Sequence, residues 1–113
     1  MELDMRKAQP QDLDGLDQVM LVISDAAGER GKVLRLLEHI TADPQKYLLV
    51  AEDKDTGTIC GSLFGVVFED ICDSCRPILL VENVAVLESY QGKDLEYKEY
   101  EPLFHYVEPK EKC

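Results

Sequence analysis

Apolar side chains recur at helical spacing in two stretches near the start of the chain. The first stretch follows Asp12, a residue type that can cap a helix, and its apolar positions are Leu13, Leu16, Val19, Met20, Ile23 and Ala27. The second follows Gly28, and its apolar positions are Val33, Leu34, Leu36, Leu37 and Ile40. Asp43-Pro44 ends the second stretch, because proline lacks a backbone donor. The pattern predicts two helices behind a short opening strand at residues 5–8.

The pattern then changes to one that is typical of strands. Residues 47–52 and 58–68 are apolar or β-branched segments on either side of the turn-forming residues 53–57, which predicts a β-hairpin. Residues 69–76 form an acidic connection. The unbroken apolar run at residues 78–87 predicts a central strand that is covered on both faces.

Composition and charge narrow the classes of function. The chain has 113 residues and 45% hydrophobic content, as expected for one domain that buries a core. Its 23 acidic and 12 basic residues give a net charge of -11, which would repel nucleic acid and an anionic membrane surface. We therefore expect no nucleic-acid or membrane partner. With no signal-like start and no run long enough to span a bilayer, the sequence predicts a soluble, cytoplasmic protein.

Cys72 and Cys75 form a C-x-x-C pair in the acidic connection. Such a pair can supply half of a tetrahedral zinc site, but His39 and His105 lack the spacing of the two further ligands. We expect no metal, and a reduced loop with two thiols.

Residues 81–93 read Val-Glu-Asn-Val-Ala-Val-Leu-Glu-Ser-Tyr-Gln-Gly-Lys. A strand followed by such a loop, after a helix pair and a hairpin, resembles the GNAT superfamily of N-acetyltransferases, in which a central strand opens into a Gln/Arg-x-x-Gly-x-Gly/Ala loop. The resemblance covers residues 1–93. It implies an α/β fold of the α+β type, with a mixed, mainly antiparallel sheet flanked by helices. The fold would be incomplete at its C-terminal end, where residues 94–113 form an acidic tail with a short helix and a possible strand.

The resemblance also implies an activity, the transfer of an acetyl group from acetyl-CoA to an amine. By resemblance, the backbone of Val84, Ala85 and Val86 would hold the pantetheine arm and the thioester. Gln91, Gly92 and Lys93 would begin the pyrophosphate cradle, with Tyr90 supporting the loop. Glycine-rich turns suit this role because their exposed N–H groups approach an anion closely.

Glu82 is the candidate catalytic residue, since some family members keep a general base on this strand, often acting through water. Its position between Val81 and Asn83 predicts partial burial, which would raise its pKa. The alternative is that Glu82 faces solvent or pairs with a lysine. The acceptor would be an amine-bearing small molecule, a protein N-terminus or a lysine, and the negative charge suits such a cation.

Two carboxylates interrupt the motif. Asp94 and Glu96 stand where the family places glycine and glycine or alanine. A carboxylate about 4 Å from a phosphate charge is repelled by about 4 kcal/mol at an effective dielectric near 20, so the sequence predicts weak acetyl-CoA binding.

The second hypothesis is a non-catalytic, GNAT-derived interaction module that covers an open sheet edge by forming a homodimer. A third is that the chain beyond Lys93 reflects an altered end. In the tail, the apolar residues expected to pack onto the sheet are Leu95, Leu103, Phe104 and Val107.

Overall fold

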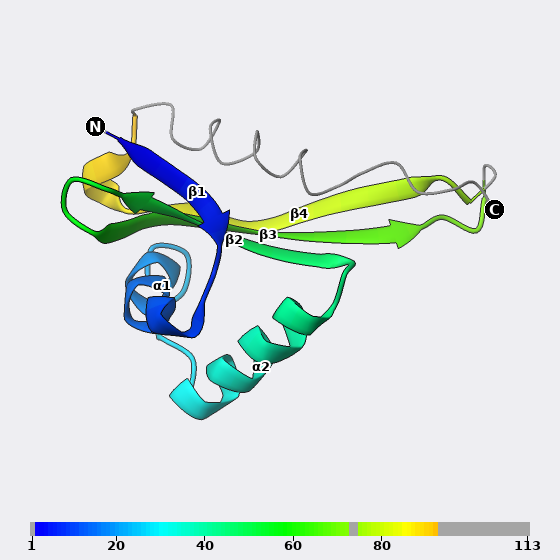
Figure 1. The fold of residues 1–113 in the computed structure, drawn as a ribbon, viewed down its shortest axis with the longest axis horizontal. Coiled ribbons are helices and arrows are strands. Elements are labelled where there is room, and N and C mark those ends of the chain that lie inside the picture. Colours follow the sequence, from blue (N-terminus) through cyan, green and yellow to red (C-terminus); the bar gives the residue numbers. More distant parts are fainter. Residues whose placement is uncertain (1, 73–74, 93–113) are drawn as a thin grey trace.

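The computed structural model describes residues 2–72 and 75–92. Along the chain lie β1 (Leu3–Lys7), the 3-10 turn η1 (Pro10–Asp12), α1 (Leu13–Met20), α2 (Arg30–Ala42), β2 (Lys46–Asp53), β3 (Thr58–Glu69), β4 (Pro77–Val86) and the 3-10 turn η3 (Glu88–Tyr90). The predicted order of strand, two helices, hairpin and long strand is therefore confirmed (Figure 1). The division at residue 93 and the tail at 94–113 lie outside the described residues.

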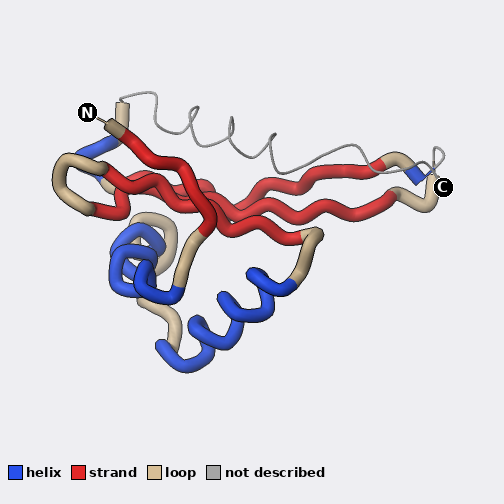
Figure 2. Tube along the Cα trace, in the orientation of Figure 1, coloured by secondary structure: helices blue, strands red, loops and turns tan. Residues whose placement is uncertain are grey.

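The four strands form one sheet in the order β1-β2-β3-β4, and each neighbouring pair is antiparallel. The predicted fold class, helices against a mainly antiparallel sheet, is confirmed. The expectation that residues 78–87 are covered on both faces is wrong for the first part of β4, where Leu80 and Glu82 are exposed. In the described part of the chain β4 is the last strand, and its first half extends with β3 beyond the helices (Figure 2).

Both helices pack on the same face of the sheet (Figure 1). Their core contacts join Leu16 and Val19 of α1 and Leu37 of α2 to Val50 and Ala85 of the sheet. At Gly15 the approach of α1 is so close that an added Cβ would lie 2.6 Å from Ile59 Cβ. Glycine is therefore the residue that lets α1 lie against β3.

α1 is shorter than the hydrophobic spacing predicts. It ends at Met20, and Ile23, expected on its apolar face, is 48% exposed. Residues 21–29 form a turn and a loop and are exposed throughout. Ile23 and Ala27 therefore continue the helical spacing of apolar residues in the sequence without belonging to the helix. Asp12 does not cap α1 with its side chain, because its carboxylate is bonded to Arg6 and to the Gln9 N–H.

α2 and the hairpin follow the prediction. Glu29 caps α2 by accepting hydrogen bonds of 2.9 Å from the N–H groups of Gly31 and Lys32. Between β2 and β3, the Gly57 N–H donates to the Asp53 carbonyl over 2.7 Å, and Gly57 has a φ of 77°, the left-handed region in which glycine is unstrained.

β4 carries a β-bulge near its end. Glu82 lies opposite Phe64 and Ala85 opposite Ser62, so Asn83 and Val84 together face Leu63. Asn83 has a φ of 54°, a left-handed conformation that asparagine tolerates better than most residues. The bulge bends the strand where the sequence predicts the thioester site.

Candidate functional site

The end of β4 is firmly embedded in the sheet. Ala85 and Val86 are both 3% exposed; Ala85 joins the core beneath the helices, and Val86 joins a separate cluster with Ala51 and Cys60. Val84 packs with the apolar cluster that includes Leu63. The three residues predicted to hold the thioester thus lie at the bulged end of the strand, with their side chains used for packing.

The loop after β4 is fixed at three points. The Leu87 N–H donates to the Cys60 carbonyl over 2.8 Å, and the Gln91 side-chain amide donates to the Val86 carbonyl over 3.0 Å. The Tyr90 hydroxyl donates to Asp53 Oδ2 over 2.6 Å, tying η3 to the hairpin turn. Tyr90 therefore supports the loop, as expected.

Gly92 is the last described residue of this loop. Its φ is 79°, and among the described residues no atom lies within 4 Å of the position that a Cβ would occupy. Glycine adopts this left-handed backbone without strain. Lys93 of the predicted pyrophosphate cradle lies outside the described residues, and so do Asp94 and Glu96.

The hydrogen bond between Tyr90 and Asp53 shifts the pKa values of both side chains. It lowers the pKa of Asp53 below its ordinary value of 3.8, with help from the Asp55 N–H, and it raises the pKa of Tyr90 above 10.0. The Asp53 carboxylate is therefore ionised at neutral pH and keeps the Tyr90 hydroxyl as its donor.

Glu82 is exposed, so the expected partial burial is wrong. The cause is its place in β4, just before the bulge, on a strand with no described neighbour on its outer side. Because Glu82 is the register partner of Phe64, their side chains lie on the same face of the sheet. That face carries the helices.

A cavity of about 390 Å³ lies between the two helices and this face, and we call it the helix–sheet cavity. Its lining residues are Leu16, Asp17, Met20, Gly28, Val33, Leu36, Ile40, Lys46, Leu48, Ser62, Phe64 and Asn83. The bulge residue Asn83 places the cavity next to the end of β4. Ser62 is 1% exposed, and its hydroxyl has no hydrogen-bond partner among the described residues.

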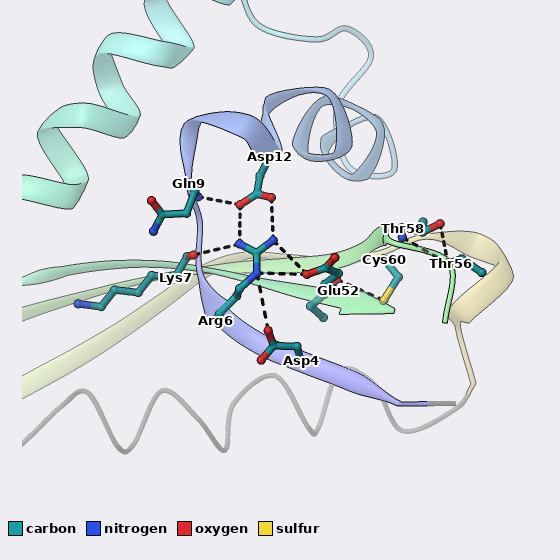
Figure 3. Close-up of polar contacts among 10 residues, drawn as sticks. Asp4, Arg6, Lys7, Gln9, Asp12, Glu52, Thr56, Thr58 and Cys60 are labelled. Carbon is teal, nitrogen blue, oxygen red and sulfur yellow. Dashed lines mark hydrogen bonds and ion pairs between the residues drawn. The ribbon is translucent and has the colours of Figure 1, made fainter. Parts of the chain in front are cut away.

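A second cavity, of about 520 Å³, lies by the Arg6 cluster, which comprises Arg6, Gln9, Asp12 and Glu52 (Figure 3). The Arg6 guanidinium donates two hydrogen bonds to Asp12, at 2.7 and 2.9 Å, and reaches Glu52 Oε1 at 3.3 Å. The Gln9 N–H donates to Asp12 Oδ2 over 2.7 Å. Its charged groups thus satisfy one another, and this cavity has no contact with β4. We regard it as structural.

Ionisation in the Arg6 cluster follows from these contacts. Burial on its own would raise the pKa of Asp12, but the hydrogen bonds from Arg6 and Gln9 outweigh it and hold that pKa below the ordinary 3.8. The hydrogen bond to Asp12 raises the pKa of Arg6. The pair is therefore fully charged at neutral pH.

Cys72 and Cys75, in the connection between β3 and β4, differ in oxidation state. Cys75 is disulfide-bonded and Cys72 is free, so the expectation of two thiols holds only for Cys72. Within residues 2–72 and 75–92, no three His, Cys, Asp or Glu side chains gather closely enough to hold a metal ion. In the same ranges, no helix is long and apolar enough to cross a membrane.

Sequence reasoning missed the helix–sheet cavity and the Arg6 cluster. Ser62 reads as an ordinary strand residue, and only the bulge register brings it level with Ala85. Arg6 and Asp12 are six residues apart across a turn, a spacing that matches no helical or strand pairing rule. The one available signal was the polar pattern of β1, where Asp4 and Arg6 alternate with Leu3 and Met5.

Comparison with known proteins gives matches among solved structures only. No protein-family model and no curated protein matches the sequence. Glucosamine-6-phosphate N-acetyltransferase from Arabidopsis thaliana superposes with a TM-score of 0.83 at 19% identity, over 94% of this chain and 74% of that one. A GNAT family acetyltransferase from Staphylococcus aureus gives 0.73 at 13% identity, over 94% and 78%.

A third similar structure contains a ligand. AAC(6')-Iy, in complex with the bisubstrate analogue CoA-S-monomethyl-acetylneamine, superposes with a TM-score of 0.74 at 15% identity, over 94% of this chain and 71% of that one. At such identities the likeness concerns the fold. This chain has the fold of these acetyltransferases, as its sequence predicts.

Proposed function

We propose, on the premise that the chain has the GNAT acetyltransferase fold, that it is an N-acetyltransferase that moves an acetyl group from acetyl-CoA to an amine. The observation that carries the proposal is the bulged end of β4, which lies between the fixed loop that contains Tyr90, Gln91 and Gly92 and the helix–sheet cavity. This arrangement offers backbone groups for one substrate beside a cavity for the other. The bound CoA analogue in a protein of the same fold supports acetyl-CoA as the donor.

The two parts of the acetyl-CoA site have different tasks. The backbone of Val84, Ala85 and Val86 binds the pantetheine arm and the thioester carbonyl, since their side chains are used for packing. The backbone of Gln91, Gly92 and Lys93 binds the pyrophosphate. The Gln91 side chain acts indirectly, by holding the loop to the Val86 carbonyl.

The reaction is an acyl transfer. The lone pair of a neutral amine attacks the thioester carbonyl, an N–C bond forms, the C–S bond breaks, and the CoA thiolate leaves and takes up a proton. The amine loses one proton to Glu82, through water, because this exposed carboxylate lies on the cavity side of β4. Backbone N–H groups at the bulge stabilise the oxyanion of the intermediate.

Amide chemical shifts of the 15N-labelled chain, recorded during an acetyl-CoA titration, test the binding site. We expect the largest changes at residues 84–86 and 91–93. Changes confined to the Arg6 cluster would contradict the proposal. For the chemistry, Glu82→Gln should slow acetyl transfer about a hundredfold, and Glu88→Gln, on η3, should leave the rate unchanged; equal rates in all three proteins would remove Glu82 from the mechanism.

A second candidate function is a non-catalytic module that forms a homodimer through β4. It is favoured by apolar exposure around the far end of the β3–β4 hairpin, where Phe68, Ile71 and Leu80 are 45%, 93% and 46% exposed. Sedimentation equilibrium at several concentrations decides it. A dimer that Leu80→Lys dissociates would support the module, whereas a monomer at all concentrations would exclude it.

The net negative charge of the chain bears on which partners it can bind. With a net charge of -11, we propose that the acceptor is a cationic amine and that nucleic acid and anionic membranes are not partners. We also propose a cytoplasmic location, where acetyl-CoA is made available to such enzymes.

A further inference from the structure

The walls of the helix–sheet cavity are mainly apolar. α1 contributes Leu16 and Met20, α2 contributes Ile40, and the sheet contributes Leu48 and Phe64. A volume of about 390 Å³ falls at the lower end of the range that small-molecule sites occupy. The walls suit a compact apolar body.

One carboxylate lines this apolar cavity. The Asp17 side chain is only 25% exposed, and its contact with the Arg30 guanidinium is long, at 4.0 Å. The same Arg30 nitrogen lies 2.7 Å from Asp14, so Asp14 is its closer partner. Lys46 also lines the cavity, but its ammonium lies 3.7 Å from Asp43. Asp17 therefore remains able to bind a cation.

A second polar group in the lining is the Ser62 hydroxyl. It is buried, and no described group forms a hydrogen bond with it. A buried polar group without a partner is unfavourable and needs an explanation. A bound ligand that carries a donor or an acceptor supplies one. Ser62 is also the register partner of Ala85, so a ligand atom bonded to it lies next to the proposed thioester site.

We propose that the acceptor is a small primary amine attached to an apolar aliphatic or aromatic body, rather than a polar sugar amine or a protein chain. Asp17 attracts the ammonium form, the apolar walls hold the body, and the Ser62 hydroxyl binds the nitrogen beside the thioester. This inference rests on the proposed acetyl transfer, since it names the substrate class of that same site.

Phenethylamine, titrated into the 15N-labelled full chain without acetyl-CoA, tests the proposal independently of catalysis. We expect amide shift changes at Met20, Ser62 and Phe64. The uncharged 2-phenylethanol and the polar amine glucosamine should each bind at least about tenfold more weakly, because each lacks one of the two recognised features. Equal binding of the alcohol, or tighter binding of glucosamine or of a lysine-containing peptide, would overturn the proposal.

Substitutions in the helix–sheet cavity test whether phenethylamine binds there. Asp17→Asn should weaken phenethylamine binding about tenfold, and Ser62→Ala several-fold. Asp25→Asn removes the same charge from the exposed loop after α1 and should change nothing. Unchanged binding in both cavity variants would overturn the proposal.

The outcomes separate this inference from the proposed function. If acetyl-CoA binds at the end of β4 but phenethylamine does not bind, the substrate class is wrong and the acetyl transfer stands. If phenethylamine binds in the cavity and acetyl-CoA does not bind at all, the amine site stands and the transfer is wrong.

Discussion

Buried polar groups near β1, at one edge of the described sheet, are hydrogen-bonded, whereas a buried polar group near β4, at the other edge, is not bonded to any described group. At the β1 side, Asp12 is 4% exposed, and both of its carboxylate oxygens are bonded, to Arg6 and to the Gln9 backbone. At the β4 side, the Ser62 hydroxyl is equally buried and has no described partner, and Asn83 has a left-handed backbone. In the first region, hydrogen bonds between polar groups join β1, η1 and β2. In the second region, the buried Ser62 hydroxyl forms no hydrogen bond with a described group.

The difference indicates a division of labour. A satisfied buried ion pair fixes one arrangement of neighbouring elements, whereas strained backbone and unpaired polar groups persist mainly where a ligand uses them. We therefore expect changes in the Arg6 cluster to act on stability, and changes around β4 to act on binding.

The largest effect is expected for Asp12→Ala. The substitution leaves the Arg6 guanidinium and the Gln9 N–H without their main acceptor, so the free energy of unfolding should fall by about 3 kcal/mol. Urea unfolding measures it. Asp14→Ala, in the first turn of α1, removes an exposed ion pair with Arg30 and should lose less than about 1 kcal/mol. Equal losses in the two variants would contradict a special role for Asp12.

The Asp12 pKa adds a pH dependence to the same comparison. Because the folded-state pKa lies below 3.8, its contribution to stability is present above that value and is lost as the pH falls through the folded pKa. The difference between the original protein and Asp12→Ala should therefore shrink below about pH 4.

Gly15→Ala should have the next largest effect. Its Cβ would lie 2.6 Å from Ile59, and the resulting shift of α1 should lower the free energy of unfolding by about 2 kcal/mol, despite the better helix propensity of alanine. Gly31→Ala in α2 meets only the flexible Glu29 side chain and should be neutral or stabilising. Equal stability of Gly15→Ala and the original protein would show that the helix can move at little cost.

Ser62→Ala should change stability in the opposite direction. Removing a buried hydroxyl without a partner should raise the free energy of unfolding by about 1 kcal/mol while weakening amine binding. Ser24→Ala, which removes an exposed hydroxyl bonded to the Ala26 carbonyl, should not be stabilising. A loss of stability in Ser62→Ala would show that the hydroxyl already has a structural partner.

The smallest change is expected for Tyr90→Phe. Without the 2.6 Å hydrogen bond, the pKa of Asp53 should rise toward 3.8. The carboxylate's contribution to stability, which is present above that pH and lost as the pH falls through the folded-state pKa, should decrease accordingly. Carboxyl carbon shifts in an NMR titration measure this pKa. Tyr47→Phe, near the other end of β2, should leave it unchanged. A similar pKa in all three proteins would show that Tyr90 does not hold the loop to the hairpin.

The fold was more predictable than the site. α2, the hairpin and β4 follow from periodicity and from turn chemistry around Gly57, which are local properties of the sequence. The length of α1 was overestimated, because spacing alone cannot show that residues 21–29 leave the core. The burial of Glu82 was misjudged because an apolar run does not reveal which strand has an open side.

The candidate site was predictable where it depends on a motif and not where it depends on register. Val84–Val86 and Gln91-Gly92 lie together at the end of β4 because they are close in sequence. The pairing of Ser62 with Ala85, and the Asp17 carboxylate in the same cavity, depend on a bulge and on helix docking, which no local pattern encodes.

The most direct measurement is a calorimetric titration of acetyl-CoA into the original chain and into the double variant Asp94→Gly, Glu96→Gly. We expect weak binding by the original, and binding up to about a thousandfold tighter by the variant, because a repulsion of about 4 kcal/mol is removed at the pyrophosphate loop. The control Glu99→Gly, Glu101→Gly removes the same charge and should change the affinity little. Equal affinity in all three proteins would contradict acetyl-CoA binding at the end of β4.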